Sequence, residues 1–135
     1  MVKELIKRDV SDDNIKSNKE SKEIAKLKDH MLKEEPYLDP NLSVNSLANK
    51  MNILDNELSV LINHHLNQHF FDFVNEYRIR KTMEILQDPN KREYTVLEIL
   101  YEVGFNSKSS FNTALKKYAK VTPTEYRKTH LKIAS

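Results

Sequence analysis

The chain has 135 residues, with 22 Lys and Arg, 20 Asp and Glu, no Cys and a single Gly. About nine glycines would be expected at average usage. Phosphate-binding loops need several of them for close backbone approach, so a P-loop or a dinucleotide fingerprint is excluded. The lack of Cys excludes disulfides, thiolate zinc sites and a cysteine nucleophile. Few Gly and Pro residues favour a mostly helical protein.

Charge is distributed unevenly along the chain. Residues 1–35 carry no net charge, residues 36–90 carry −3 and residues 91–135 carry +5. A basic last third indicates an anionic partner for that part of the chain. No run approaches the roughly 18 apolar residues of a membrane span, and no secretory pattern opens the sequence. We therefore expect a cytoplasmic protein.

The first 22 residues are rich in charge, Ser and Asn, which is typical of a tail or linker. A folded domain is predicted over residues 23–135. Its first helix ends before Pro36 and carries apolar residues at helical spacing, namely Ile24, Leu27, Met31 and Leu32.

Two short helices joined by a tight turn are predicted at about residues 43–67. Ser43 is a suitable N-cap for the first of them. The inner face of the second helix is predicted to hold Leu58, Leu61, Ile62, His65 and Leu66. A longer helix then covers about residues 70–87 and ends at Asp88-Pro89-Asn90.

A second pair of short helices is predicted at about residues 95–120, with Thr95 and Ser107 as N-caps. Thr122 and Glu125 then have the spacing of a capping box, which starts a last short helix at about residues 123–131. The sequence therefore predicts an all-α fold of about seven helices. In it, a long linker helix joins two helix-turn-helix units.

The two helix pairs repeat one another. Leu47, Ala48, Met51, Asn52 and Ile53 correspond to Ile99, Leu100, Val103, Gly104 and Phe105 at an offset of 52 residues. Past the turn the offset is 53, so Leu58 matches Phe111. Asn52, Asn67 and Gly104 are the predicted left-handed turn residues. In a DNA-binding unit of this form, the second helix enters the major groove.

The outward faces of the two second helices follow from the 100° step of an α-helix. In the first unit the outward residues are Asn56, Val60, Asn63 and Asn67, flanked by Ser59 and His64. In the second unit they are Ser109, Thr113, Lys116 and Lys120, flanked by Asn112 and Lys117. Short polar side chains and lysines suit contacts with base edges and phosphates.

The second unit also carries a specific motif. It reads Gly104-Phe105-Asn106-Ser107-Lys108-Ser109-Ser110-Phe111 and continues to Thr122-Pro123-Thr124-Glu125-Tyr126-Arg127. This stretch resembles the second helix-turn-helix of the AraC/XylS family of bacterial transcription regulators, and the resemblance covers about residues 23–131. It implies a DNA-binding domain of seven helices whose two recognition helices enter adjacent major grooves, roughly 34 Å apart.

The resemblance also implies partners. These are double-stranded DNA and RNA polymerase, often for activation, with no cofactor and no catalysis. Leu61-Ile62-Asn63 and the segment 71–75 resemble a subset of the family in which this domain follows a sensor or transmembrane region. Residues 1–35 would suit a linker from such a region, and the full-length protein would then be tethered to the inner membrane.

Each outward face supplies candidate DNA contacts. The candidates for base contact are Asn56, Ser59, Val60, Asn63, Ser109, Asn112, Thr113 and Lys116. The candidates for phosphate contact are Lys50, His64, Ser107, Lys108, Lys117, Lys120, Arg127 and Lys128. Asn63 is the first choice for readout, because Asn pairs with adenine through two hydrogen bonds. We expect the C-terminal unit to supply charge and the N-terminal unit to supply short-range readout.

The sequence departs from the family pattern at several positions. Family members usually carry Arg at the positions of Val60 and Thr113. Its loss supports the alternative of a helical protein-interaction module that keeps the fold and has lost tight DNA binding. Leu54 replaces a capping Ser, so Asp55 is predicted as the N-cap. Lys120 replaces a glycine, so this turn is either strained or differently shaped.

The remaining polar residues have more than one interpretation. His64, His65 and His69 suggest a metal site, but no Glu or Cys completes a known pattern. His64 near DNA and His65 in the core are the favoured assignments. Arg78 and Arg80 are expected to bind carboxylates between the two units, with phosphate as the alternative. No nucleophile triad or pair of acid–base carboxylates is visible, so neither an enzyme nor a metal site is predicted.

Overall fold

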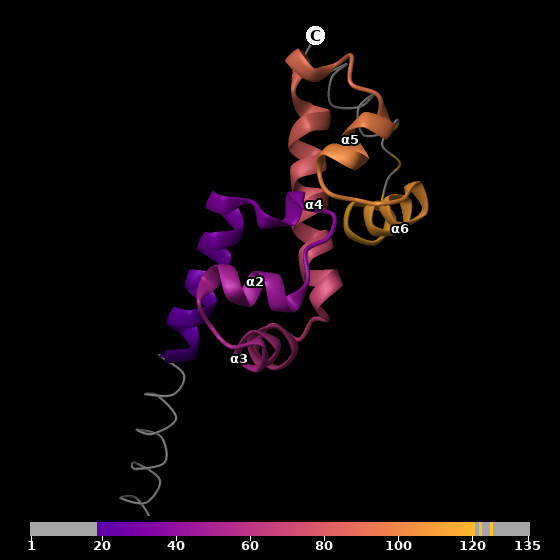
Figure 1. Cartoon of the computed structure of the whole chain (residues 1–135). Helices are drawn as coiled ribbons and strands as arrows, with labels where there is room; N and C mark the ends of the chain where they lie inside the picture. Colours follow the sequence, from indigo (N-terminus) through magenta and orange to yellow (C-terminus); the bar gives the residue numbers. More distant parts are fainter. Residues whose placement is uncertain (1–18, 121, 123–124, 126–135) are drawn as a thin grey trace, which may run out of the picture.

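The chain folds into two helical lobes that one long helix, α4, joins (Figure 1). The computed structural model describes residues 19–120, 122 and 125. Every regular element among these residues is helical, which confirms the predicted all-α class. A helix at residues 19–34 precedes η1 (Pro36–Leu38), α2 (Val44–Met51), α3 (Asp55–Val60), η2 (Leu61–His65), α4 (Phe70–Gln87), η3 (Pro89–Lys91), α5 (Val96–Glu102) and α6 (Lys108–Ala119).

Parts of the predicted ends lie outside the described residues. These parts are residues 1–18, most of the predicted helix at 123–131, and the candidate phosphate ligands Arg127 and Lys128. At the other boundary, residues 19–22, assigned above to the tail, are helical and continuous with residues 23–34. Leu27 and Met31 of this helix are fully buried. Leu32, which belongs to the same apolar pattern, is 64% exposed.

Side chains at the N-caps start three of the helices as predicted. Ser43, Thr95 and Ser107 each accept a hydrogen bond from the backbone N–H three residues later, at 3.1 Å. The prediction of Asp55 as a cap is wrong, since Leu54 occupies the N-cap and makes no side-chain bond there. Asp55 is instead the first residue of α3, and its carboxylate accepts a hydrogen bond from Asn45 of α2 at 2.9 Å.

The predicted capping box after α6 is also present. The Glu125 backbone N–H donates to Thr122 Oγ1 at 3.2 Å. In return, the Thr122 backbone N–H donates to the Glu125 carboxylate at 3.3 Å. These reciprocal bonds satisfy two donors that a helix start leaves unpaired.

The second helix of the first unit changes its winding halfway. After α3 the chain continues as a π-helical turn, in which the Leu66 backbone N–H donates to the Leu61 carbonyl, five residues earlier, at 3.0 Å. Wider turns rotate less per residue than the assumed 100°. This corrects the placement of His65 in the core: it lies at the surface, with Nδ1 3.4 Å from the Glu20 carboxylate.

Each lobe has its own hydrophobic core, and α4 contributes to both. Its first half places Phe73, Val74 and Tyr77 among the buried residues of the first lobe. Its second half places Ile79, Ile85 and Leu86 in the second lobe. Leu38 of η1 packs against both clusters. The linker helix is therefore part of both cores, and burial along both of its halves fixes both lobes to it.

Arg78, in the middle of α4, joins the lobes through polar contacts. Only 6% of this residue is exposed. Its Nε donates to the Tyr37 carbonyl at 2.8 Å and its Nη2 to the Asp39 carbonyl at 3.0 Å. The guanidinium also lies over the Phe105 ring, 5.6 Å from its centre. The expected partners were carboxylates, and this was wrong: η1 and the residue that follows it supply backbone carbonyls, which need a donor where they are shielded from water.

Gly104 lies directly against this junction. It has a φ of +105°, and a Cβ placed there would overlap the Tyr37 carbonyl oxygen and approach Arg78 Nε to 2.8 Å. Beside it, the Asn106 side chain donates to the Pro40 carbonyl at 3.3 Å. The single glycine of the chain is thus required for close approach of the lobes as well as for its turn.

Gly104→Ala should lower the free energy of unfolding by about 2–4 kcal/mol, because a strained backbone and an overpacked contact each cost about 1–3 kcal/mol. Asn52→Gly is the matched control. Asn52 is the counterpart of Gly104 in the repeat and has an ordinary left-handed φ of 58°, so its replacement should change stability by a few tenths of a kcal/mol. Urea denaturation measures both variants, and the reverse order would refute this placement of Gly104.

Candidate nucleic-acid interface

The two helix-turn-helix units close their first helices in the same way. The Ile53 backbone N–H donates to the Ala48 carbonyl at 3.0 Å, and the Phe105 N–H donates to the Leu100 carbonyl at 3.0 Å. Asn52 and Gly104, which precede these donors, both have positive φ. Equal closures at an offset of 52 residues direct the second helix of each unit away from its first helix in a similar manner.

The predicted polar face of the first unit is divided between α3 and the π turn. Asn56, Asn63 and His64 are exposed, and Val60 is 44% exposed. Ser59 is half-buried. The helix therefore offers amide groups and one apolar side chain to a ligand, with no cation of its own on this face.

The polar face of the second unit lies on α6. Ser109, Asn112, Thr113 and Lys116 are all exposed. Ser107 stands at the N-cap, where its hydroxyl bonds the Ser110 backbone N–H at 3.1 Å and donates to Ser110 Oγ at 2.9 Å. Its predicted role as a phosphate ligand would compete with this capping role.

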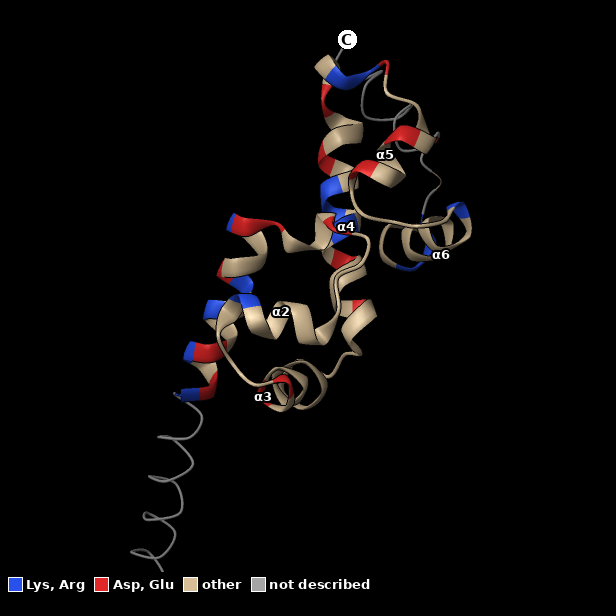
Figure 2. Cartoon of the chain, in the orientation of Figure 1, with Lys and Arg blue, Asp and Glu red and all other residues tan. Residues whose placement is uncertain are grey.

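Positive charge in the second unit lies on α6, whereas α5 carries the acids Glu98 and Glu102 (Figure 2). Lys108, Lys116, Lys117 and Lys120 lie on or directly after α6, and all are exposed. The first unit has the exposed Lys50, but α3 itself begins with the exposed acids Asp55 and Glu57. The exposed charges are therefore distributed unequally between the two units. That the C-terminal unit supplies the charge attraction for DNA stays a prediction.

The turns that end both second helices keep left-handed backbone conformations. Asn67 has a φ of 52° and Lys120 a φ of 58°. The Lys120 N–H reaches the Leu115 and Lys116 carbonyls, both at 3.2 Å. The Lys120 turn therefore keeps the shape that a glycine would give it. A left-handed conformation costs a residue with a side chain roughly 1–2 kcal/mol.

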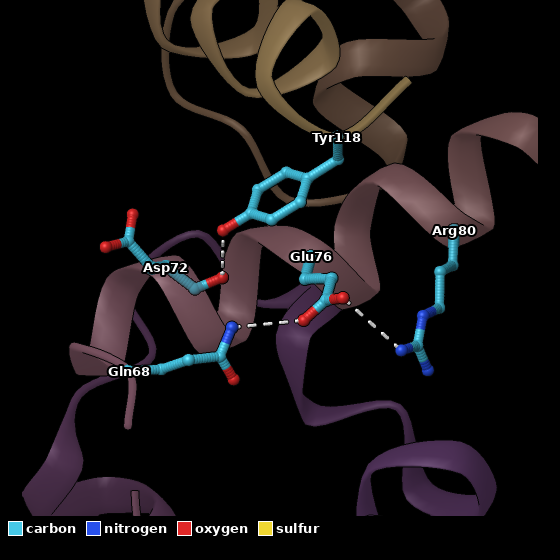
Figure 3. A network of polar contacts seen from close by, with 5 residues as sticks. All are labelled: Gln68, Asp72, Glu76, Arg80 and Tyr118. Atoms are coloured by element: carbon cyan, nitrogen blue, oxygen red, sulfur yellow. Dashed lines mark hydrogen bonds and ion pairs between the residues drawn. The ribbon is translucent and has the colours of Figure 1, made fainter. Parts of the chain in front are cut away.

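A set of polar contacts links α6 to the start of α4. The Tyr118 hydroxyl donates to the Asp72 carbonyl at 3.0 Å, and Lys117 Nζ lies 3.3 Å from the Asp72 carboxylate. On the same helix, Glu76 accepts from Gln68 at 3.1 Å and from Arg80 at 3.5 Å (Figure 3). Arg80 thus pairs with a carboxylate of its own helix and not with one from the other unit.

A hollow of about 430 Å³ separates the two polar faces. It is lined from the first unit by Asn63, Asn67 and Gln68, from α4 by Asp72, and from α6 by Lys117 and Tyr118. The hollow brings the predicted readout residue Asn63 and the predicted phosphate ligand Lys117 to one place, although they are far apart in the sequence. Sequence reasoning missed Asp72, whose only local signal was an acidic residue in the first turn of a helix.

Negative charge from the N-terminal helix also reaches the first face. Glu20 and Glu23 line a hollow of about 410 Å³ together with Asn56 and Val60. Glu57 of α3 and Lys19 line the same hollow, which therefore holds three carboxylates and one ammonium group. Spacing within each helix gave no signal for this contact, because Glu23 and Asn56 lie 33 residues apart in the sequence.

The described histidines form no metal-binding cluster, although His65 contacts the Glu20 carboxylate. In the part of the chain that the structure describes, no group of three or more His, Asp or Glu residues is placed to hold a metal ion. Over the same residues, no helix is both long and apolar enough to cross a membrane.

Comparison with known proteins first defines the class. Residues 47–129 match a helix-turn-helix domain family, and the match covers both units and the linker helix between them. The chain belongs to this family in its AraC-type form, the DNA-binding domain of transcription regulators. Such domains bind DNA and are not a family of enzymes.

The particular relatives agree with this assignment. An uncharacterized helix-turn-helix transcriptional regulator of Bacillus subtilis, YdeC, is 40% identical over 63 residues, which are 47% of this chain and 21% of that protein. The chain therefore spans about a fifth of the length of this curated relative.

Two solved structures are similar over most of the chain. One is the C-terminal domain of AraT, a response regulator from Geobacillus stearothermophilus, with 26% identity and a TM-score of 0.63, covering 78% of this chain and 84% of that one. The other is the C-terminal domain of the two-component response regulator yesN from Fusobacterium nucleatum, with 28% identity and a TM-score of 0.61, covering 79% and 97%.

Tyr118→Phe should lower the free energy of unfolding by about 0.5–1.5 kcal/mol, because it removes one net hydrogen bond between α6 and α4. Tyr101→Phe is the matched control, since Tyr101 is 55% exposed on α5 and should tolerate the change. Guanidinium denaturation of both variants measures the difference. Equal effects would show that the bond to Asp72 does not hold α6 in place.

Proposed function

We propose that this chain is the sequence-specific output domain of a transcription regulator. In this proposal the segment from Asp55 to His65 and helix α6 enter adjacent major grooves on one face of a duplex. The observation that carries the proposal is the equivalent placement of exposed polar side chains on the second helix of both units, at an offset of 53 residues. A solvated surface helix would need no such correspondence between the two units.

The two faces are assigned different tasks. Asn63 is exposed and aimed at the space between the units, where its amide would read a base edge. Lys108, Lys116 and Lys120 lie on α6 or directly after it and would neutralise phosphates. Lys116 is assigned to phosphate in preference to the base contact that its place on the outward face also allows. Phosphate contacts carry much of the affinity but no sequence information. Val60 would contact a thymine methyl group, a role that an apolar side chain can fill without the family arginine.

The partners of the full-length protein belong to the same proposal. Both solved relatives described above are C-terminal domains of response regulators, which supports a sensory region ahead of residue 19 that controls the domain. RNA polymerase would be the protein partner that the DNA-bound regulator contacts or recruits at a promoter. The rival function, a protein-interaction module without tight DNA binding, is an outcome of the test below.

Selection from a random duplex pool tests the proposal. The purified chain, at low salt, should enrich two short elements separated by about one helical turn of DNA. Failure to enrich any motif would favour the protein-interaction module.

Single substitutions should then separate the two tasks on the selected site. Asn63→Ala should relax preference at one or two base pairs, each worth about 1–3 kcal/mol of discrimination. Lys116→Ala should weaken binding to all sequences and reduce the slope of log K against log salt by about 0.9. Lys91→Ala is the matched control. It removes the same charge from η3, which follows the C-terminal end of α4 (Figure 1), and should change neither the affinity nor the salt slope. If Asn63→Ala and Lys116→Ala behaved alike, the division of tasks would be wrong.

A further inference from the structure

We propose that Asp72 lowers the affinity of this domain for DNA by holding Lys117 in an ion pair between the two recognition elements. The proposal rests on the DNA-binding function given above. It adds an acidic residue that affects DNA binding through Lys117 and contacts neither a base nor a phosphate itself. Its role is opposite to that of the surrounding lysines. Asp72 competes with phosphate for a cation that the duplex would otherwise use.

The geometry of the pair is well defined on both sides. Lys117 Nζ lies 3.3 Å from Asp72 Oδ1, and the Tyr118 hydroxyl donates to the carbonyl of the same Asp72 at 3.0 Å. Two successive residues of α6 are thus fastened to one residue of α4. Lys117 Nζ also lies 5.4 Å from the centre of the Tyr118 ring, which further restricts its side chain.

The pair stands where a duplex would place phosphate. Asn63 and Lys117 line one hollow from opposite units. A DNA backbone that passes from one contacted groove to the next crosses the space between the recognition elements. Asp72 puts a negative charge in this hollow, where it repels phosphate and neutralises the nearest cation.

The side chains remain accessible, so the competition is reversible. The side chain of Lys117 is 55% exposed and that of Asp72 is 41% exposed. The hydrogen bond to Asp72 is the main cause that raises the pKa of Lys117. An exposed pair of this kind is weak and screened by salt, so the carboxylate and a duplex phosphate compete for Lys117, and Lys117 neutralises no phosphate while the pair persists. Lys116, its neighbour on α6, is exposed and is the internal reference for a lysine on the same helix.

Asp72→Asn tests the proposal in the intact chain. The salt slope measured with a random duplex should become steeper by about 0.9, which corresponds to roughly threefold more loss of affinity between 50 and 200 mM salt. Glu98→Gln is the matched control, since it removes the same charge from the exposed face of α5, and it should leave the slope unchanged. In a Lys117→Ala background, Asp72→Asn should no longer steepen the slope.

A second readout needs no DNA. Trace acetylation followed by mass spectrometry should show Lys117 reacting more slowly than Lys116 in the original chain. Asp72→Asn should bring the two rates together.

The outcomes separate this proposal from the one it rests on. A chain that binds no duplex at low salt overturns the DNA-binding function. A chain that binds DNA, but whose slope responds equally to Asp72→Asn and Glu98→Gln, overturns the present inference alone. So does an Asp72→Asn effect that persists in the Lys117→Ala background, because it would then come from net charge and not from the pair. Equal acetylation of Lys116 and Lys117 in the original chain also contradicts it.

Discussion

Arg78 donates to two backbone carbonyls, one buried and one partly buried, where the two lobes of the chain meet. These are the carbonyls of Tyr37 in η1 and of Asp39 directly after η1, and the planar guanidinium reaches both from the middle of α4. On its other side the same group lies over Phe105 of the second lobe. A rigid fork of donors suits two carbonyls at once in a way that a flexible ammonium does not. Gly104 completes this junction, because any larger residue would collide with the Tyr37 carbonyl.

The interface for DNA depends on that junction. Each unit presents its second helix through its own caps and turn, but the direction of one face relative to the other is set by α4 and by the contacts across it. Arg78 fixes the middle of α4. Tyr118, near the end of α6, donates a hydrogen bond to the Asp72 carbonyl near the beginning of α4. In the proposed mode of binding, two recognition elements reach adjacent grooves together. They gain affinity if their spacing is fixed before binding, since ordering them afterwards costs free energy.

Features that depend on near neighbours in the chain could be predicted from the sequence. Ser43, Thr95 and Ser107 act on a backbone group three residues away, so their spacing alone reveals the caps. The repeat was visible because equivalent inner residues must fill equivalent cores. The all-helical class followed from the same periodicity.

Features that depend on distant contacts or on irregular backbone could not be predicted. A helical wheel assumes one step per residue, so it placed His65 inward and missed the π turn, whose apolar residues fit both windings. The partners of Arg78 are backbone carbonyls about 40 residues away. Every residue has a backbone carbonyl, so the residue type does not indicate which one accepts the bond. Asp72 and Lys117 belong to different helices and meet only through the fold. The same holds for Glu20 beside the first face.

The distance between the two recognition elements tests most directly the claim that Arg78 fixes their relative orientation. The chain has no cysteine, so spin labels on Asn56→Cys and Ser109→Cys attach only at those two equivalent positions. Pulsed electron paramagnetic resonance should give one narrow distance distribution for the labelled chain. With Arg78→Lys added, which keeps the charge but loses the fork, the distribution should broaden while the helical circular dichroism is retained. A distribution that is broad from the start, or equally narrow with Arg78→Lys, would contradict this account.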